Sequence, residues 1–171
     1  MKAIVAVDRT WGIGKNNDLL FSLKQDMYYF RSKTLNKIVV MGSNTLKSFP
    51  GGKPLKNRIN VVLYPGGEAR EDCIVVQSLE ELSVALKEYD TDDVFIIGGA
   101  MFYRTMLPYC DTVYVTKVDA DGQASVFFEN LDELPDWECV EEGEEREENG
   151  LRFRFTVYKN NKVSDFSVRG K

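Results

Sequence analysis

One carboxyl group in this sequence is predicted to lie among apolar residues, where its ionised form costs free energy. It is the first candidate for a group that does chemistry. Asp26 falls within the apolar stripe of a predicted helix, between Leu23 and Phe30. A carboxylate in apolar surroundings costs several kcal/mol unless it is paired, hydrogen-bonded or protonated. Two interpretations follow. Asp26 either makes a structural hydrogen bond at the edge of the stripe, or it sits in a cleft where it binds or protonates a ligand.

A pair of glycines marks the second candidate site. Four apolar residues, 94–97, predict a short strand covered on both faces, and Gly98-Gly99 follows directly. The next segment starts near Met101 and ends at Pro108, which predicts a helix. Glycines at such a junction let the phosphates of a ligand lie against bare backbone at the positive end of the helix. A tight turn that binds no ligand explains the same glycines equally well.

The composition excludes several other kinds of chemistry. The chain contains no histidine, which excludes Ser-His triads, Cys-His nucleophiles and histidine-ligated metals. Cys73, Cys110 and Cys139 lack CxxC spacing, so we expect reduced thiols and no metal site. A net charge of -5 with scattered basic residues argues against nucleic acid and membrane surfaces as partners. With no predicted signal or membrane-spanning segment, we expect a cytoplasmic protein.

The hydrophobic pattern predicts the elements that must position the two candidate sites. Strands are predicted at residues 3–7, 38–41, 59–63, 74–76, 94–97, 111–118, 137–143 and 151–158. Helices are predicted at residues 23–35, 42–49, 78–86 and 101–108. This order predicts an α/β fold with a mostly parallel central sheet flanked by helices and an antiparallel C-terminal hairpin. We expect one domain over residues 1–160 and a loose tail over residues 161–171.

Local signals refine these elements. Ser22 with Gln25 fits a capping box for the first helix, and Ser78 with Glu81 fits one for the third. Asn149-Gly150 predicts the turn of the C-terminal hairpin, and the acidic run before it is explained by a solvated hairpin. The polar loop that follows the first strand is long enough to be a lid.

Taken in order, the motifs resemble those of the dihydrofolate reductases. The resemblance spans residues 1 to about 158 and rests on Ala6-Val7-Asp8-Arg9, Gly12-Ile13-Gly14, Asp26 with Phe30, Thr34-Leu35-Asn36-Lys37, Val40-Met41-Gly42 and Gly98-Gly99. It implies transfer of a hydride from NADPH to C6 of 7,8-dihydrofolate, with a proton delivered to N5. The nicotinamide carries the redox chemistry, and Asp26 is implied as the only ionisable group at the pterin. We expect a monomer whose partner is this small substrate.

The resemblance also assigns the remaining site residues. Arg58 is implied to clamp the carboxylate of the substrate's glutamate tail, Thr116 to hydrogen-bond Asp26, and the Gly98-Gly99 peptide to be cis. The implied substrate contacts are Val5, Ala6, Leu20, Asp26, Met27, Phe30, Phe49, Leu55, Arg58, Ile97 and Thr116. The implied cofactor contacts are Ala6, Ile13, Asn17, Leu19, Leu20, Gly42, Ser43, Asn44, Thr45, Leu63, Tyr64, Gly98, Gly99, Ala100, Met101, Phe102 and Tyr103.

Several positions depart from the family pattern. Leu20-Phe21 replaces the usual Pro-Trp of the lid, and Ser125-Val126 replaces an Asp-Thr pair that steadies it. Ser43, Tyr64-Pro65 and Gln77 replace groups expected to hold the 2′-phosphate of NADPH. We therefore hypothesise that the cofactor preference has drifted, so that NADH also serves, unless other basic residues bind the phosphate.

Two alternative functions are also compatible with the sequence. A pyrimidine reductase of riboflavin synthesis shares the fold, although Asp26, Phe30 and Arg58 favour the folate substrate. The altered lid is also compatible with a catalytically weak protein that binds a pterin or a nucleotide. Turnover, as opposed to binding alone, separates these cases.

Overall fold

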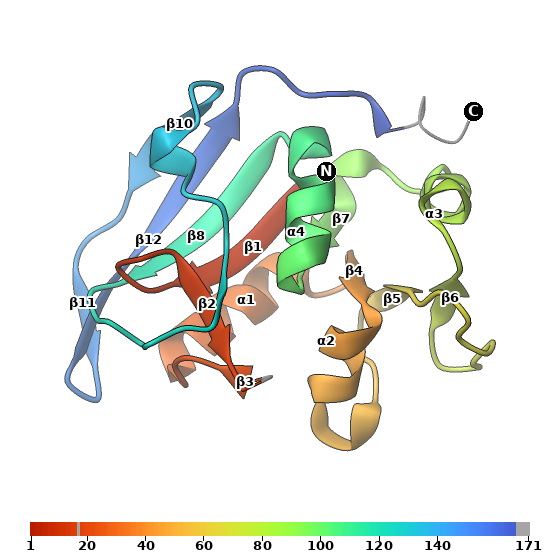
Figure 1. The fold of residues 1–171 in the computed structure, drawn as a ribbon, viewed down its shortest axis with the longest axis horizontal. Coiled ribbons are helices and arrows are strands. Elements are labelled where there is room, and N and C mark those ends of the chain that lie inside the picture. Colours follow the sequence, from red (N-terminus) through yellow and green to blue (C-terminus); the bar gives the residue numbers. More distant parts are fainter. Residues whose placement is uncertain (17, 167–171) are drawn as a thin grey trace.

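The computed structural model describes residues 1–16 and 18–166, and most of these residues are organised around one sheet (Figure 1). Nine strands of the described chain belong to it. Their order is β10 (Trp137–Glu142), β12 (Leu151–Asn160), β8 (Thr112–Val118), β1 (Lys2–Val7), β7 (Val94–Ile96), β4 (Ile38–Gly42), β5 (Ile59–Leu63) and β6 (Ile74–Val76), with β11 (Arg146–Glu148) also paired to β12.

The pairing directions confirm the predicted fold class. β1 lies in the middle of the sheet and is parallel to both β7 and β8, and β4, β5 and β6 continue the parallel part. β12 runs antiparallel to β8, β10 and β11. Asn149 and Gly150 join β11 to β12 with φ angles of 53° and 79°, the left-handed conformation that a tight hairpin turn requires.

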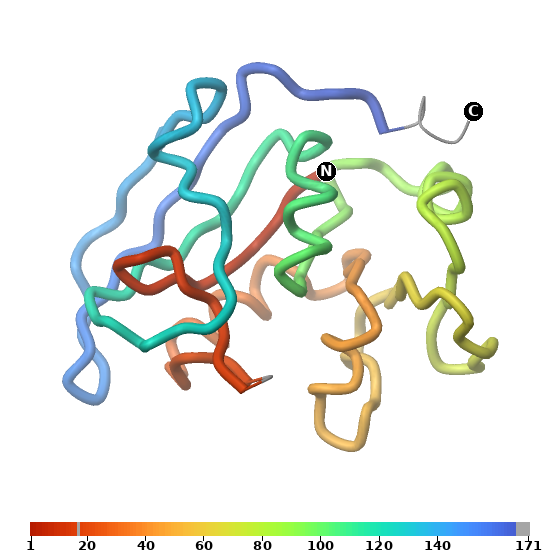
Figure 2. The backbone as a smooth tube through the Cα atoms, viewed as in Figure 1, coloured from red at the N-terminus to blue at the C-terminus, as the bar shows by residue number. Residues whose placement is uncertain are grey.

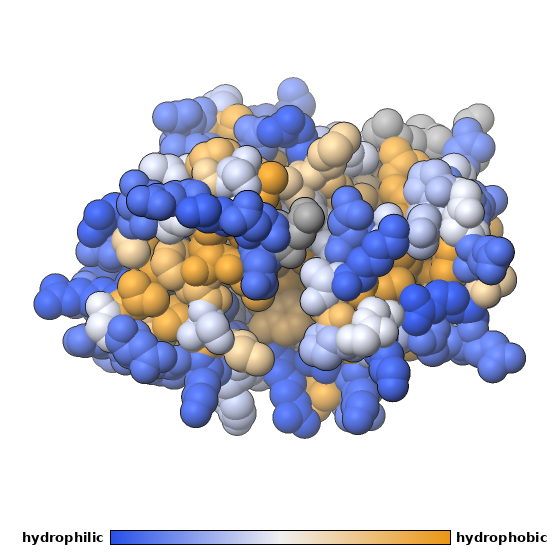
Figure 3. Space-filling model, turned by 60° about the horizontal axis from the view of Figure 1, so that its bottom comes forward, coloured by the Kyte–Doolittle hydropathy of each residue, from blue (hydrophilic) through white to orange (hydrophobic). Residues whose placement is uncertain are grey.

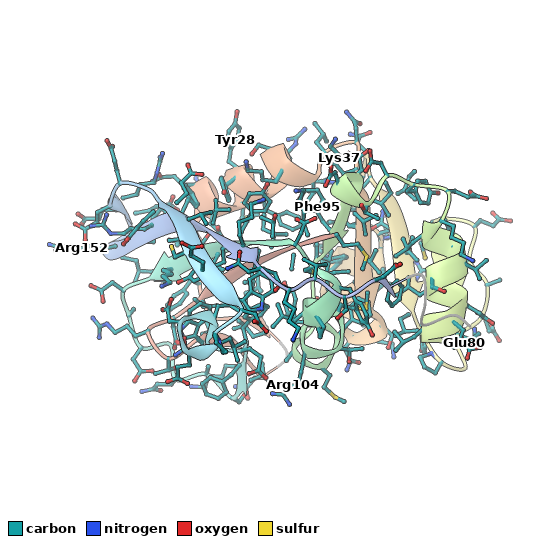
Figure 4. The ribbon with its side chains drawn as sticks, turned by 90° about the horizontal axis from the view of Figure 1, so that it is seen from above. Tyr28, Lys37, Glu80, Phe95, Arg104 and Arg152 are labelled. Atoms are coloured by element: carbon teal, nitrogen blue, oxygen red, sulfur yellow. The ribbon has the colours of Figure 1, made fainter. Side chains whose placement is uncertain are left out.

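Helices cover both faces of the sheet. They are α1 (Lys24–Thr34), α2 (Ser43–Ser48), α3 (Leu79–Leu86) and α4 (Ala100–Met106), with short 3-10 turns at Pro50–Gly52, Thr91–Asp93, Leu107–Tyr109 and Leu131–Glu133. Because neighbouring residues of a strand point to opposite faces, Ile4 and Val5 enter different cores. The Val5 core packs on α3 and α4, and the Ile4 core packs on α1 and α2. From above, Tyr28, Glu80 and Arg104 point outward from α1, α3 and α4 (Figure 4).

The loop predicted to be a lid forms a second, small sheet. β2 (Gly12–Lys15) pairs antiparallel with β3 (Asp18–Leu19) and with β9 (Val126–Phe127). At its base, Trp11 is 6% exposed and packs on Phe128 and Tyr158. The lid is therefore anchored at one end by an aromatic cluster and along its length by β9.

One predicted cap is correct and the other is wrong. Ser78 accepts the backbone N–H of Glu81 at 3.1 Å, as predicted for α3. At α1 the N-cap is Leu23, which lacks a capping side chain, so the Ser22–Gln25 capping box does not form. The Glu148 carboxylate accepts the N–H groups of Lys24 and Gln25 instead. The acidic run is therefore more than a solvated hairpin, because one of its members caps α1.

The described part of the C-terminal tail is packed rather than loose. After β12 it runs across the top of the molecule (Figure 2), and Ser164 donates its N–H to the Pro108 carbonyl at 2.9 Å. The Phe166 ring lies 4.9 Å from the Tyr109 ring and is 8% exposed. The expectation of a loose tail from residue 161 is wrong for this segment, because an aromatic side chain six residues beyond β12 finds a neighbour to bury against. Residues 167–171 lie outside the described residues.

Candidate active site

Asp26 lies on the first turn of α1, where it faces the carboxyl end of β8. The Thr116 hydroxyl donates to its Oδ1 at 2.7 Å, and Thr116 itself is 1% exposed. Burial raises the pKa of the Asp26 carboxyl, the hydrogen bond from Thr116 lowers it, and the negative charge of Glu148 raises it again, so the pKa lies above its ordinary value. Asp26 therefore keeps its proton to a higher pH than an exposed aspartate.

Apolar side chains lie on the same side of the sheet as α1. Phe30, Phe49, Leu55 and Ile97 are partly buried and pack against the Ile4 core. Met27, one residue after Asp26, leaves 63% of its surface exposed. Seen from below, the molecule is hollowed, with apolar atoms at the base of the hollow (Figure 3). A flat aromatic ligand would find apolar walls there.

The first strand offers mainly its backbone to such a ligand. The side chain of Val5 is 8% exposed and belongs to the opposite core, so only its main chain is available on the α1 side. Ala6 stands directly opposite Thr116 in the parallel pairing of β1 and β8. This register brings the end of β1 beside the hydroxyl that holds Asp26.

Arg58 is positioned as a cation at the far end of α1. Its Nε donates to the Thr34 hydroxyl at 3.2 Å and its Nη1 to the Lys56 carbonyl at 2.9 Å, and its guanidinium lies 5.9 Å from the Phe30 ring centre. Partial burial and the neighbouring charge of Arg31 lower the pKa of Arg58. The two arginines place excess positive charge where a ligand carboxylate would neutralise it.

The N-termini of α2 and α4 meet at the glycine pair, where the backbone of Gly42, Gly98 and Gly99 forms a cradle. The Gly98-Gly99 peptide is cis, as the resemblance implies, and Gly42 donates its N–H to the Gly98 carbonyl at 2.9 Å. The N-cap residues of α2 and α4 are Gly42 and Gly99, and neither helix has a side-chain cap. A Cβ at Gly98, whose φ is +132°, would come within 3.1 Å of the Thr45 hydroxyl. Bare backbone beside two uncapped N-termini fits the phosphates of a dinucleotide.

Tyr103 connects this cradle to the first strand. Its hydroxyl donates to the Ile4 carbonyl at 2.7 Å, and the ring is 7% exposed. Burial raises the pKa of Tyr103 far above its ordinary value, so the hydroxyl stays a proton donor to the backbone. Tyr103 therefore holds α4 against β1 and sets the distance between the cradle and the Asp26 side of the sheet.

Two basic side chains near the end of β5, Arg70 and Lys47, differ in how well they could bind an anionic group. Arg70 makes two hydrogen bonds to the Asp72 carboxylate, at 2.8 and 2.7 Å, so its charge is neutralised. Lys47 lies 4.8 Å from the centre of the Tyr64 ring. Gln77 bonds both Gly66 and Gly67 and so ties the turn that follows Tyr64. Lys47 is therefore the better placed of the two basic residues to meet an anionic group beside Tyr64.

Some of the predicted site residues meet in the structure. Thr116 bonds Asp26, and both Gly42 and Thr45 lie against Gly98. Leu19 and Met101 are 77% and 84% exposed, so both are open to a ligand. Asn17 lies outside the described residues.

Sequence reasoning missed two residues that organise the site. Glu148 caps the helix that carries Asp26, and Asp8 binds both the lid and the loop that follows β8. The signal for Asp8 was available, because it is a carboxylate directly after a buried strand. No local signal singles out Glu148 from its acidic neighbours.

Comparisons with known proteins agree over nearly the whole chain. Residues 1–160 match the family model described as dihydrofolate reductase. The chain is 34% identical to a dihydrofolate reductase of Bacillus subtilis (strain 168) over 158 residues, which is 91% of each chain. It is 31% identical to that of Staphylococcus haemolyticus, covering 91% of this chain and 92% of the relative. It is 32% identical to that of Haemophilus influenzae, covering 90% and 94%.

Proposed function

We propose that this chain, which belongs to the dihydrofolate reductase family and reduces 7,8-dihydrofolate to 5,6,7,8-tetrahydrofolate, takes its hydride from NADPH at a site built around Asp26. Family membership implies a nicotinamide nucleotide cofactor. The comparisons favour neither the pyrimidine reductase nor the weak binding protein.

The observation that carries the proposed site is the hydrogen bond from Thr116 to Asp26. This bond occupies one carboxyl oxygen and leaves the other available to the pterin. Reduced nicotinamide, when bound, supplies the hydride. Asp26 binds the pterin's amino group and ring nitrogen, and its raised pKa lets it favour protonation at N5 through water. Thr116 fixes the direction in which the carboxyl points.

The other residues bind and orient the two molecules. Phe30, Phe49, Leu55 and Ile97 form the apolar wall that excludes water from the reacting atoms. Arg58 binds the tail carboxylate of the substrate at the distant end of the same helix. The backbone around Gly98 receives the cofactor's phosphates, because two uncapped helix starts meet there.

A spectrophotometric turnover assay tests the proposed role of Asp26. Asp26→Asn should lower kcat/KM for dihydrofolate at neutral pH by about 100-fold or more, because the amide cannot supply a proton. Activity should return in part at acid pH, because the substrate is then protonated directly from solution. Asp136→Asn, an exposed position, is the matched control and should change little. Full activity of Asp26→Asn at neutral pH would remove Asp26 from the mechanism.

The proposed preference for NADPH rests on Lys47. A 2′-phosphate carries about two charges and needs a cation, and Lys47 stands beside Tyr64 while Arg70 is held by Asp72. Fluorescence quenching with NADPH and NADH should show tighter binding of NADPH, and Lys47→Gln should lose about 10-fold of that preference. Lys87→Gln, at the end of α3, is the control. Equal binding of the two cofactors by the wild type would instead support the drift hypothesis.

We further propose a cytoplasmic monomer whose reductase domain spans residues 1–160, with residues 161–166 packed against that domain. Three free cysteines suit a reducing compartment. No helix among the described residues has the length and apolar character to cross a membrane. Sedimentation analysis of the purified chain would reveal a dimer if the monomer proposal is wrong.

A further inference from the structure

We infer that Glu148 is a positioning residue for the reaction: its carboxylate seats the N-terminus of α1 on the C-terminal hairpin and thereby holds Asp26 in place. The inference rests on the proposed role of Asp26 where it concerns activity.

The contacts of Glu148 replace the missing cap of α1. Oε2 accepts the N–H of Lys24 at 2.6 Å and Oε1 accepts the N–H of Gln25 at 3.0 Å. These two residues directly precede Asp26. The N-cap, Leu23, is extended with φ −116° and ψ 118° and offers no polar side chain. One carboxylate thus satisfies two backbone donors that a helix start leaves free.

The neighbours of Glu148 reinforce the same junction. Gln25 donates its side-chain amide to the Glu147 carbonyl at 3.3 Å, and Arg146 donates to the Gln25 side chain at 3.4 Å. Leu23 is 2% exposed and packs in a cluster with Val118 and Phe153. The start of α1 therefore touches the hairpin through both polar and apolar contacts.

The hairpin and the partner of Asp26 belong to one hydrogen-bonded unit. Glu148 pairs with Leu151 across the turn from β11 to β12, and Phe155 of β12 pairs with Thr116 of β8. Thr116 holds the Asp26 side chain, while Glu148 holds the backbone N–H groups one and two residues earlier. The Asp26 side chain and the backbone that precedes it are thus both held by the same group of strands, β8, β12 and β11.

Glu148 also acts on Asp26 through charge. The titratable groups that face Asp26 are Glu148 from β11, Tyr103 from α4 and Tyr29 from its own helix. Of these, Glu148 is the group that is ionised at neutral pH, since burial raises the pKa of both tyrosines while hydrogen bonds from Gln25 and Lys24 lower the pKa of Glu148. The free N-terminus of α1 would favour the carboxylate form of Asp26. Glu148 offsets that field and so favours the protonated form.

A direct titration of Asp26 tests this inference. The ¹³C chemical shift of the Asp26 carboxyl is followed against pH by NMR in the ligand-free wild type and in Glu148→Gln. Removing the charge removes the repulsion, so the titration midpoint should fall, by roughly half a pH unit or more. Glu147→Gln removes an equal charge from the adjacent exposed residue and should move the midpoint much less. Equal midpoints in Glu148→Gln and the wild type would overturn the inference.

A third variant shows that the titration can report a change in either direction. Thr116→Val removes the hydrogen bond that lowers the pKa of Asp26, so its midpoint should rise. In the turnover assay, Glu148→Gln should move the pH at which hydride transfer falls by half to lower pH, whereas Glu147→Gln should not. The NMR titrations are made without ligand, so they decide the role of Glu148 even if Asp26→Asn proves fully active.

Amide hydrogen exchange keeps the inference testable if Glu148→Gln does not fold. The N–H groups of Lys24 and Gln25 in the wild type should exchange more slowly than unstructured amides, because each is hydrogen-bonded. Exchange of both at the unstructured rate would contradict the cap without any variant. In Glu148→Asp, which keeps the charge on a shorter side chain, both amides should exchange faster than in the wild type.

Discussion

The Asp8 carboxylate accepts the backbone N–H of Gly122 at 2.9 Å through Oδ2, although 114 residues separate them in the chain. Its Oδ1 accepts the N–H of Gly12 at 2.7 Å and also bonds Thr10. Asp8 is 3% exposed. One buried carboxylate at the end of β1 thus joins the lid to the loop after β8. It gives the lid an anchor that does not depend on the altered Ser125-Val126 pair.

Asp8→Asn should therefore destabilise the protein. An amide can accept hydrogen bonds only through its single oxygen, and its NH₂ group would face a backbone N–H that then has no acceptor. The loss in unfolding free energy should be about 2 kcal/mol, the cost of a buried donor left unsatisfied, measured by urea denaturation. Asp119→Asn, which breaks an exposed ion pair with Arg9, is the control and should change stability far less. Equal losses of unfolding free energy in both variants would mean that the hydrogen bonds of Asp8 stabilise the protein no more than the exposed ion pair does.

Asp8 and Asp26 should give the protein opposite responses to pH. The folded-state pKa of Asp8 is lowered by its hydrogen bonds, so its stabilisation is present above the ordinary pKa near 3.8 and is lost as pH falls through the folded value. The folded-state pKa of Asp26 is raised, so the stability linked to its proton is present below the ordinary pKa and is lost as pH rises through the folded value.

It follows that Asp26→Asn should melt at a higher temperature than the wild type at neutral pH. The amide avoids the cost of a charge in an apolar cleft and can still accept the Thr116 hydroxyl. The gain should shrink as the pH is lowered towards 4, which calorimetry at several pH values can follow. A lower melting temperature for Asp26→Asn at neutral pH would show that the ionised carboxylate is stabilising, against this account.

Gly98→Ala should weaken binding of the nicotinamide nucleotide more than it affects folding. The new methyl group would stand 3.1 Å from the Thr45 hydroxyl, at a φ of +132°, inside the backbone cradle. We expect the dissociation constant for NADPH to rise by about 10-fold or more, as measured by fluorescence quenching. Gly150→Ala also places a side chain at positive φ, but with nothing within 4 Å, and should leave binding unchanged. Unchanged binding in Gly98→Ala would place the phosphates elsewhere.

Arg58→Met should separate recognition of the substrate's tail from recognition of its ring. The variant loses the guanidinium but keeps an apolar stem over Phe30, so the KM for dihydrofolate should rise by about 10-fold or more. A dihydropterin that lacks the glutamate tail should be reduced equally well by variant and wild type. A loss for both substrates would assign Arg58 a structural role through Thr34 and Lys56.

Short-range patterns were enough to predict the framework of the fold. The runs at Ile59–Leu63 and Ile74–Val76 are strands with the predicted bounds, and Ser78 caps α3. Each of these features depends on residues that are close in the chain, because strand alternation and helix capping act over a few positions. The placement of Asp26 in an apolar stripe was also visible locally.

Only the tertiary structure decided what holds the site together. The Ser22–Gln25 pattern is a reasonable local cap, but Glu148, more than 120 residues away, takes its place. Asp8 reaches Gly122, and Phe166 finds Tyr109, through contacts that no periodicity encodes. A sequence lists the donors and acceptors, but which of them meet depends on strand order and register. The residues that could do chemistry were therefore predictable one by one, whereas their fixed positions follow from pairings across the whole sheet.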